Sequence, residues 1–242
     1  MRLDQRKEHI LDFIVRDFIR TAVPVSSGRI NGKKGGGGGL AASPATIRNI
    51  MLELDEDGYL YQPHTSAGRA PTGKGYRYFI ENLMAIESPP SEIRKDLDGI
   101  LDDFWDESES VFDEFARVLA RHLKLFSGVG LLDEERIFGH GLPEVLREPE
   151  FEEHNLAAEF ADFAENAESA LRDLKSDFEN EEFRPQIDIK RFSSVSVAFN
   201  DQEFGRCVMF SFGPKRMNYE RASSTLKYAA RDIKKRKSKK YG

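Results

Sequence analysis

The sequence predicts an α+β protein of two domains, the first of them a winged helix-turn-helix domain. Ser43–Asn49 begins like a helix with polar side chains in its first turns, and a polar turn at Pro63–Ala70 follows a short apolar run. This order is typical of a recognition helix and its wing. Further along, Ile187–Phe199 and Glu203–Phe212 alternate apolar and polar residues, which predicts a β-hairpin around Asn200-Asp201.

The first two helices are predicted from the spacing of apolar residues. Within Asp4–Thr21 they recur at intervals of three and four, as on one face of a helix. They are Ile10, Leu11, Ile14, Val15 and Phe18. Asp4 can cap this helix, and Pro24 ends the helical region. Val25–Ile30 is then expected to form a short second helix with Ser26 at its start.

A third helix is predicted over Ser43–Glu56. The Ser43 hydroxyl can accept a free backbone N–H, and Pro44 suits the first helical position. Gly58 suits the left-handed residue that ends many helices. The apolar stripe of this helix, which we expect to be buried, consists of Ile47, Ile50, Met51 and Leu54.

A short strand, a turn and a fourth helix complete the first domain. The strand is expected at Tyr59–Gln62, and Thr72 can cap a helix over Gly73–Met84. Ser88-Pro89-Pro90 reads as a linker, where the charge of the chain also changes. We therefore predict a winged-helix domain at 1–86, a linker at 87–90 and a second domain at 91–242.

The second domain is expected to mix acidic helices with strands. Ser91–Leu125 reads as a long amphipathic helix or a helix pair, Gly128–Leu132 as a strand and Leu142–Phe178 as further helices. Tyr219–Lys235 is the final amphipathic helix, and its end overlaps a basic tail at Lys234–Lys240. The inward residues of this helix are expected to be Ala222, Leu226, Ala229, Ala230 and Ile233.

Charge is distributed unevenly along the chain. Residues 1–86 carry 12 Lys and Arg against 9 Asp and Glu, a net charge of +3. Residues 87–186 carry 10 against 28, and residues 187–242 carry 14 against 5. Because phosphate repels carboxylates, we expect the acidic middle to point away from any bound DNA. A charge of +3 is small for a DNA-binding domain, and two copies in a dimer would strengthen it.

The composition argues against several other classes. No apolar run approaches the roughly 18 residues that a membrane span needs, and the charged N-terminus is not a signal peptide. A single cysteine, Cys207, excludes an intramolecular disulfide and a cysteine metal cluster, and it is expected to be a buried apolar residue. The five histidines show no ligand spacing. We expect a cytoplasmic protein that is not an enzyme, with no cofactor, no metal and no membrane partner.

Five segments of the chain resemble the family of bacterial heat-inducible transcription repressors named HrcA. They are S-P-A-T-I-R-N at Ser43–Asn49, E-L-D-E-D-G-Y-L at Glu53–Leu60, Q-P-H-T-S-A-G-R-A-P-T-G-K-G-Y-R-Y-F at Gln62–Phe79, I-F-G-H-G-L-P-E-V-L-R-E-P-E-F at Ile137–Phe151 and G-P-K-R-M-N-Y at Gly213–Tyr219. The N-terminal segments are long and specific, and the resemblance reaches both ends of the chain.

The resemblance implies more than the residues do by themselves. It implies a winged-helix domain joined to a GAF-like α+β dimerisation or effector domain, a homodimer on an inverted-repeat operator, and repression of chaperone operons. It also implies that the GroE chaperonin tunes the repressor. This chain has only the short stretch Phe126–Arg136 where the family has a longer run of strands, so its GAF-like domain is shortened.

Ten residues are candidates for contacts with double-stranded DNA: Ser43, Ala45, Thr46, Arg48, Asn49, His64, Thr65, Ser66, Arg69 and Lys74. Arg can bond to guanine and Asn to adenine through two hydrogen bonds, and a helix N-terminus can hold a phosphate. Arg69 is expected to reach a phosphate or the minor groove from the wing.

Simpler interpretations stay open for these residues. Arg48 and Asn49 could be solvated, His64 could bond within its turn, and Lys74 could be an ordinary surface residue. The five glycines at 35–39 predict a loop, or else an arm that touches phosphate through Lys33 and Lys34. The alternative function is a protein-interaction or scaffold module with little specific DNA binding.

Overall fold

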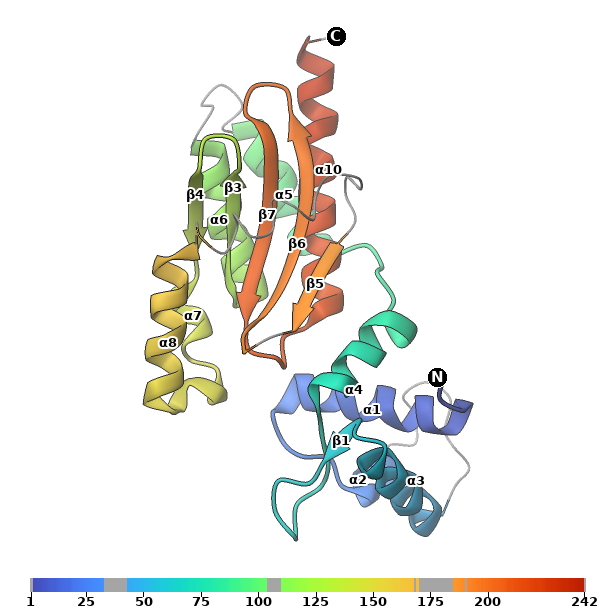
Figure 1. Ribbon diagram of the computed structural model, residues 1–242. Helices are drawn as coiled ribbons and strands as arrows, with labels where there is room; N and C mark the ends of the chain where they lie inside the picture. The colour runs from blue at the N-terminus through green and yellow to red at the C-terminus, as the bar shows by residue number, and fades with distance from the viewer. Residues whose placement is uncertain are drawn as a thin grey trace. The chain divides into compact units, whose positions relative to one another are not determined.

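The fold is mixed α and β, as the sequence predicts. It is seen in a computed structural model that describes residues 2–32, 43–103, 110–167, 169, 185–189 and 191–241 (Figure 1). The glycines at 35–39, with Lys33 and Lys34, lie outside the described residues, as do residues 104–109 of the expected helix or helix pair Ser91–Leu125 and residues 170–178 of the predicted helical region Leu142–Phe178. The chain divides into two compact units. The first is Met1–Ala85 with Lys215–Met217, and the second is Ile86–Pro214 with Asn218–Gly242.

Three helices form the body of the first unit: α1 (Gln5–Thr21), α2 (Ser27–Gly32) and α3 (Pro44–Glu56). Asp4 caps α1 by accepting hydrogen bonds from the N–H groups of Arg6 and Lys7, as predicted. Ile10, Leu11, Ile14 and Val15 are fully buried. Val25 is not helical, in contrast to the prediction, because its backbone pairs with Arg69 in an isolated antiparallel bridge.

A two-stranded hairpin and a fourth helix complete this unit. Strand β1 (Leu60–Tyr61) pairs antiparallel with β2 (Ala70–Pro71), shorter than the predicted strand. Thr72 caps α4 (Gly73–Tyr78), which continues as a π-helical turn, η1 (Phe79–Leu83). The predicted helix over Gly73–Met84 is thus present, but it changes from an α-helix to a π-helix after Tyr78.

The second unit is built on an antiparallel sheet. Among the described residues, five strands are ordered β4-β3-β7-β6-β5. They are β3 (Phe126–Leu131), β4 (Arg136–His140), β5 (Pro185–Ile189), β6 (Ser193–Asp201) and β7 (Gly205–Gly213). The hairpin of β6 and β7 is confirmed, although its last pair is Asp201 with Gly205. The prediction of one strand over Ile187–Phe199 is wrong, because the chain bends at Arg191 and Phe192 between β5 and β6.

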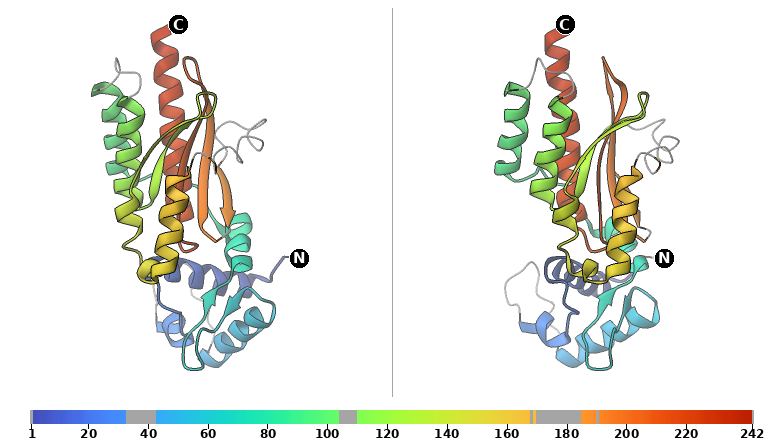
Figure 2. Two further views of the ribbon diagram at one scale, coloured as in Figure 1. Left: turned by 60° about the vertical axis from the view of Figure 1, so that its left-hand side comes forward. Right: turned by 90° about the vertical axis from the view of Figure 1, so that its left-hand side faces the viewer.

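Helices cover both faces of this sheet. Helices α5 (Ser91–Asp103), α6 (Ser110–Leu123) and α10 (Tyr219–Tyr241) lie together on one face, and α8 (His154–Glu165) lies on the other side (Figure 2). Two short helical segments, α7 (Leu142–Val145) and η2 (Pro149–Glu152), precede α8. All five predicted inward residues of α10 are fully buried, and α10 runs on through the basic tail.

The apolar stripe of α5 and α6 is buried within this unit. Ile93, Leu97 and Phe115 are almost fully buried, and α6 packs on β3 while α5 packs on α6 and α10. Its burial within one chain leaves no apolar face on these residues for a second copy. The homodimer that the family resemblance implies is therefore not supported by this stripe.

Candidate nucleic-acid interface

Helix α3 is held in place by its apolar face and its N-terminal cap. Ile47 and Leu54 are 1% and 0% exposed, and α3 packs on both α1 and α2. The Ser43 hydroxyl accepts a hydrogen bond from the Thr46 N–H at 3.1 Å. Helices α1 and α2 are themselves joined by an ion pair of 2.8 Å between Arg29 Nε and Asp17 Oδ2. The outer face of α3 is thereby presented by a closely packed three-helix body.

The outer face of α3 carries most of the residues predicted to touch DNA. Ser43, Ala45, Arg48 and Asn49 are exposed. Thr46 is half-buried, and its hydroxyl lies 3.0 Å from the Ser43 hydroxyl, so it takes part in the cap. The exposed set matches what a helix needs if its N-terminal half is to enter the major groove.

Leu52 is a residue of this face that the sequence reasoning missed. It is 48% exposed, and it is one of four large apolar residues among those described that are at least 40% exposed. It follows Arg48 by four residues and Asn49 by three, so the three side chains share one face of the helix. Helical spacing alone could have found it, because Leu52 is out of phase with the buried stripe.

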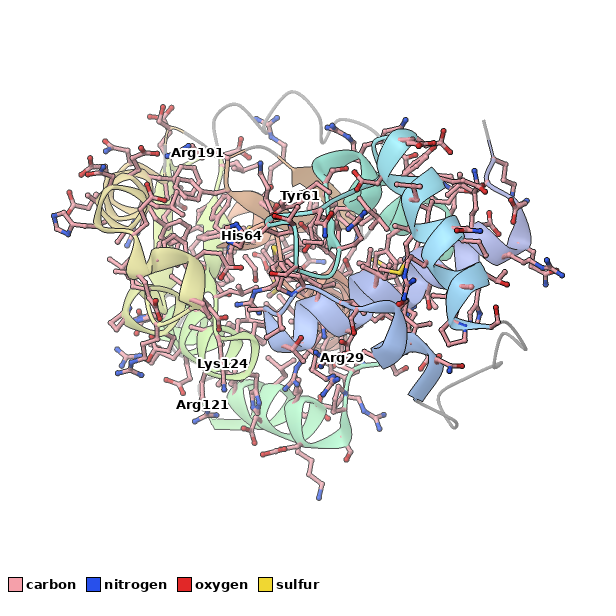
Figure 3. The ribbon with its side chains drawn as sticks, turned by 90° about the horizontal axis from the view of Figure 1, so that it is seen from below. Arg29, Tyr61, His64, Arg121, Lys124 and Arg191 are labelled. Atoms are coloured by element: carbon pink, nitrogen blue, oxygen red, sulfur yellow. The ribbon has the colours of Figure 1, made fainter. Side chains whose placement is uncertain are left out.

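The turn between β1 and β2 presents a second group of predicted residues. His64, Thr65 and Ser66 are exposed at its tip. Beneath them, the Gln62 side-chain amide donates hydrogen bonds to the carbonyl oxygens of Thr65 and Ala67, at 3.0 and 2.9 Å. Figure 3 shows Tyr61 and His64 on this hairpin, and Tyr61 is 46% exposed. The turn has an ordered backbone and an exposed polar tip.

Arg69 is anchored within the first unit. Its guanidinium Nε lies 2.7 Å from Asp55 Oδ2 of α3, and the side chains are 16% and 29% exposed. Its backbone N–H and C=O exchange hydrogen bonds with Val25 at 2.8 and 2.9 Å. A Cβ at the preceding Gly68 would lie 2.3 Å from the Val25 carbonyl, so only glycine permits this approach. The structure thus places Arg69 at the base of the hairpin, away from the exposed tip.

Lysines compensate the acidic C-terminal end of α3. Lys74 Nζ donates to the Asp57 carbonyl at 2.7 Å and lies 4.3 Å from the centre of the Tyr59 ring. Lys7 Nζ lies 3.0 Å from Glu53 and 3.1 Å from Asp57. Hydrogen bonds to these two carboxylates raise the pKa of Lys7. The carboxylates beside the outer face are therefore partly neutralised.

In the part of the chain that the structure describes, the metal-ligating side chains do not cluster. Within these ranges, no group of three or more His, Cys, Asp or Glu side chains could hold a metal ion. Cys207 is fully buried, as predicted. His122 and His140 each face one aspartate, Asp96 at 2.8 Å and Asp113 at 2.7 Å. Among the helices that the structure describes, none has the length and apolarity for crossing a membrane.

Residues 82–222 match the family model described as the HrcA protein C-terminal domain. The chain belongs to the HrcA family. The resemblance drawn from the sequence motifs is thereby confirmed, and the match covers more than half of the chain.

Curated HrcA relatives are similar to this chain over stretches that are shorter than the match to the family model. The chain is 54% identical over 92 residues to the heat-inducible transcription repressor HrcA of Desulforudis audaxviator, covering 38% of this chain and 26% of that protein. It is 42% identical over 125 residues to the HrcA of Caldanaerobacter subterraneus subsp. tengcongensis, covering 50% and 33%. The chain thus matches between a quarter and a third of the length of these relatives.

A solved structure shares the fold. A crystal structure described only as that of a hypothetical protein superposes with a TM-score of 0.69 and covers 97% of this chain and 98% of its own. The sequence identity is 19%, so this likeness concerns the fold alone.

Proposed function

We propose that this chain is a transcriptional repressor of heat-shock and chaperone operons that binds an inverted-repeat DNA operator as a homodimer in the cytoplasm. Its HrcA relatives are named heat-inducible transcription repressors, which supports this class of activity. The observation that carries the proposal is the outer face of α3, where exposed Arg48 and Asn49 stand on a capped and well-packed helix. The first unit would act as the winged helix-turn-helix domain and the second as a shortened GAF-like domain.

In this proposal α3 reads the bases. Arg48 and Asn49 would bond to base edges in the major groove, each good two-bond contact contributing roughly 1–3 kcal/mol of discrimination. Ser43 and Ala45 would lie at the helix N-terminus beside a phosphate, where free N–H groups attract anions. Thr46 would support this contact through the Ser43 hydroxyl, which it approaches to 3.0 Å.

The hairpin would act as the wing. His64, Thr65 and Ser66 are exposed at its tip and would meet the DNA backbone or the minor groove. For Arg69 and Lys74 we propose a supporting role instead, because Asp55 and the Asp57 carbonyl already engage their charged groups. The wing contact would thus come from His64, Thr65 and Ser66 and not from Arg69.

The proposed partners other than DNA are inferred from the family resemblance. A second copy is expected because an inverted repeat presents two equal half-sites. It is also expected because residues 1–86 of one copy carry a net charge of only +3. We propose the GroE chaperonin as a further partner, through the second unit.

The decisive test is a selection of bound sequences from random duplex DNA, followed by a gel shift at fixed salt. We expect an inverted repeat, bound at least about a hundredfold more tightly than a scrambled duplex. Arg48→Ala should relax the preference at one position of each half-site, while Lys95→Ala, an exposed lysine of α5, is the control. Equal affinity for the repeat and the scrambled duplex would refute the proposal.

One observation favours a protein-interaction module as the second candidate. Leu52 and Tyr61, 48% and 46% exposed, could serve as apolar contacts for a protein partner. A partner that is captured tightly at high salt, together with only nonspecific DNA affinity, would favour this function.

A further inference from the structure

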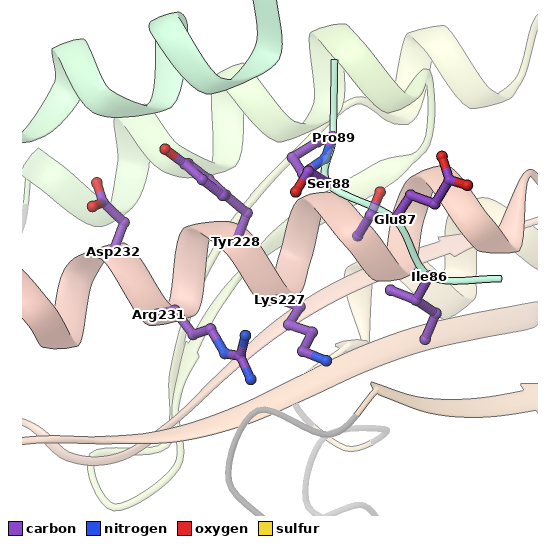
Figure 4. A pocket seen from close by; sticks show the side chains of 9 residues that line it. Ile86, Glu87, Ser88, Pro89, Lys227, Tyr228, Arg231 and Asp232 are labelled. Atoms are coloured by element: carbon purple, nitrogen blue, oxygen red, sulfur yellow. The ribbon is translucent and has the colours of Figure 1, made fainter. Parts of the chain in front are cut away.

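A groove in the second unit lies between the linker and α10. It has a volume of about 320 Å³, within the usual range for small-molecule sites. One wall is the chain segment Ile86–Pro89, and the other is one face of α10 (Figure 4). The α10 residues are Ser224, Lys227, Tyr228, Arg231 and Asp232, which recur at helical spacing. All the lining residues belong to the second unit.

Two cationic side chains reach out from the same side of α10. Lys227 and Arg231 are one helical turn apart and extend in the same direction in Figure 4. Lys227 is half-buried, and within the described part of the chain its ammonium has no hydrogen-bond or ion-pair partner. A partly desolvated cation without a partner favours an anion beside it.

Apolar surface lies next to these cations. Ile86 is 40% exposed on the linker wall, and Pro89 is buried. Tyr228 contributes a ring whose hydroxyl donates to Asp98 of α5 at 2.8 Å. Burial and the Asp98 carboxylate raise the pKa of Tyr228 to about 12, so this donor stays protonated at neutral pH. The ring is therefore a fixed and uncharged wall.

The carboxylates of the groove restrict which anion fits. Glu87 on the linker and Asp232 on α10 also line it. These charges oppose a polyanion such as a nucleic acid, which would place further phosphates beside them. A molecule with one anionic group and an apolar body matches the groove better.

We propose that this groove binds a small organic anion. Its carboxylate or phosphate monoester would lie at Lys227 and Arg231, and its apolar part would lie on Ile86. Because the linker is one wall, the bound molecule would hold Ile86–Pro89 against α10. If the first unit binds DNA as proposed above, such binding would provide a route from a small-molecule signal to the operator.

Phenyl phosphate is a suitable probe, with phenol and inorganic phosphate as its two halves. Calorimetric titration of the full chain at constant ionic strength should show saturable binding of phenyl phosphate that is at least about fivefold tighter than that of either half. Lys227→Gln and Arg231→Gln should each weaken binding about fivefold. The control Lys95→Gln removes an exposed α5 lysine and should change binding less than about twofold.

A second measurement tests the linker and does not depend on DNA. Hydrogen exchange of the Ile86, Glu87 and Ser88 amides should slow at saturating phenyl phosphate in the wild type, and the slowing should be lost in Lys227→Gln. No saturable binding, equal binding of inorganic phosphate, or an equal loss in Lys95→Gln would overturn the site. If phenyl phosphate bound without slowing the hydrogen exchange of these amides, the inference that it holds the linker against α10 would be overturned. A failure to bind DNA would refute the proposed function and leave these results intact.

Discussion

At the scale of single residues, Leu52 gives the sharpest test of how α3 would read DNA. It shares the exposed face with Arg48 and Asn49, and an exposed aliphatic side chain there can touch the C5-methyl group of thymine. We predict that replacing one thymine of each selected half-site by deoxyuridine weakens binding of the wild type about fourfold per half-site, the value of one buried methyl group.

The Leu52→Ala variant supplies the control for that prediction. It should bind the thymine operator about fourfold more weakly per half-site than the wild type and should not distinguish thymine from deoxyuridine. Its stability should change by less than about 0.5 kcal/mol, because alanine suits an exposed helix position. A variant that still distinguishes the two bases would show that another residue reads the methyl group.

The hairpin residues divide into a supporting and a contacting group, which a matched pair of variants can separate. We predict that Arg69→Ala lowers the free energy of unfolding by about 1–3 kcal/mol, because it leaves the partly buried Asp55 unpaired. His64→Ala should leave stability within about 0.5 kcal/mol and weaken DNA binding. Urea denaturation and gel shifts measure the two effects. If Arg69→Ala weakened DNA binding without lowering stability, Arg69 would belong to the contacting group.

The candidate site was predictable where it depends on local sequence. The cap at Ser43 and the exposure of Arg48 and Asn49 follow from helical periodicity and were expected. The pairing of Arg69 with Asp55 was not, because it joins residues from a hairpin and a helix that only tertiary structure brings together. For the same reason Lys74 could be proposed as a surface contact but not assigned to the Asp57 carbonyl.

At the scale of elements, regular periodicity predicted the helices well and the strands less well. Helices α1, α3 and α10 begin near the expected residues, since each has an apolar stripe and a recognisable start. Strand β4 was missed because its residues are only half-buried or exposed, which leaves no strong alternation. The division of β5 from β6 was also missed, because the bend at Arg191 carries no glycine or proline.

Two histidine–aspartate pairs tie elements of the second unit together and make it sensitive to acid. Asp96 of α5 faces His122, and Asp113 of α6 faces His140 of β4. Hydrogen bonds from these histidines, aided by Arg121 and Arg117, lower the pKa of both carboxyl groups. A carboxyl group with a lowered pKa stabilises the fold above its unfolded value of about 3.9. That stabilisation is lost as the pH falls through the folded value.

We therefore predict that Asp96→Asn and Asp113→Asn destabilise the protein at pH 7 and that the difference from the wild type shrinks toward pH 3. The side chains are 39% and 36% exposed, so solvent screening limits each effect to about 1 kcal/mol or less. Urea midpoints at several pH values measure it, with Asp162→Asn, an exposed position of α8, as the control. A difference that grows on acidification would contradict the assignment.

At the scale of the whole molecule, the charge distribution decides how DNA could be bound. Residues 87–186 carry 10 basic against 28 acidic residues, so this region is repelled by the phosphate backbone. Binding would depend on the first domain, whose net charge of +3 supports few phosphate contacts. A single copy should therefore bind weakly, and two copies on one duplex should add their contacts.

We predict that the dependence of affinity on salt doubles from a half-site to the full inverted repeat. Each phosphate contact adds about 0.9 to the slope of log affinity against log salt, and a second copy repeats every contact of the first. Fluorescence anisotropy at several salt concentrations gives both slopes, and light scattering of the complex should show two chains per operator. A repeat whose half-sites are moved apart by five base pairs, half a helical turn, is the control, because it turns the second half-site to the opposite side of the duplex. Equal slopes for the half-site and the repeat would mean that one copy binds alone, and the homodimer would then have no part in recognition.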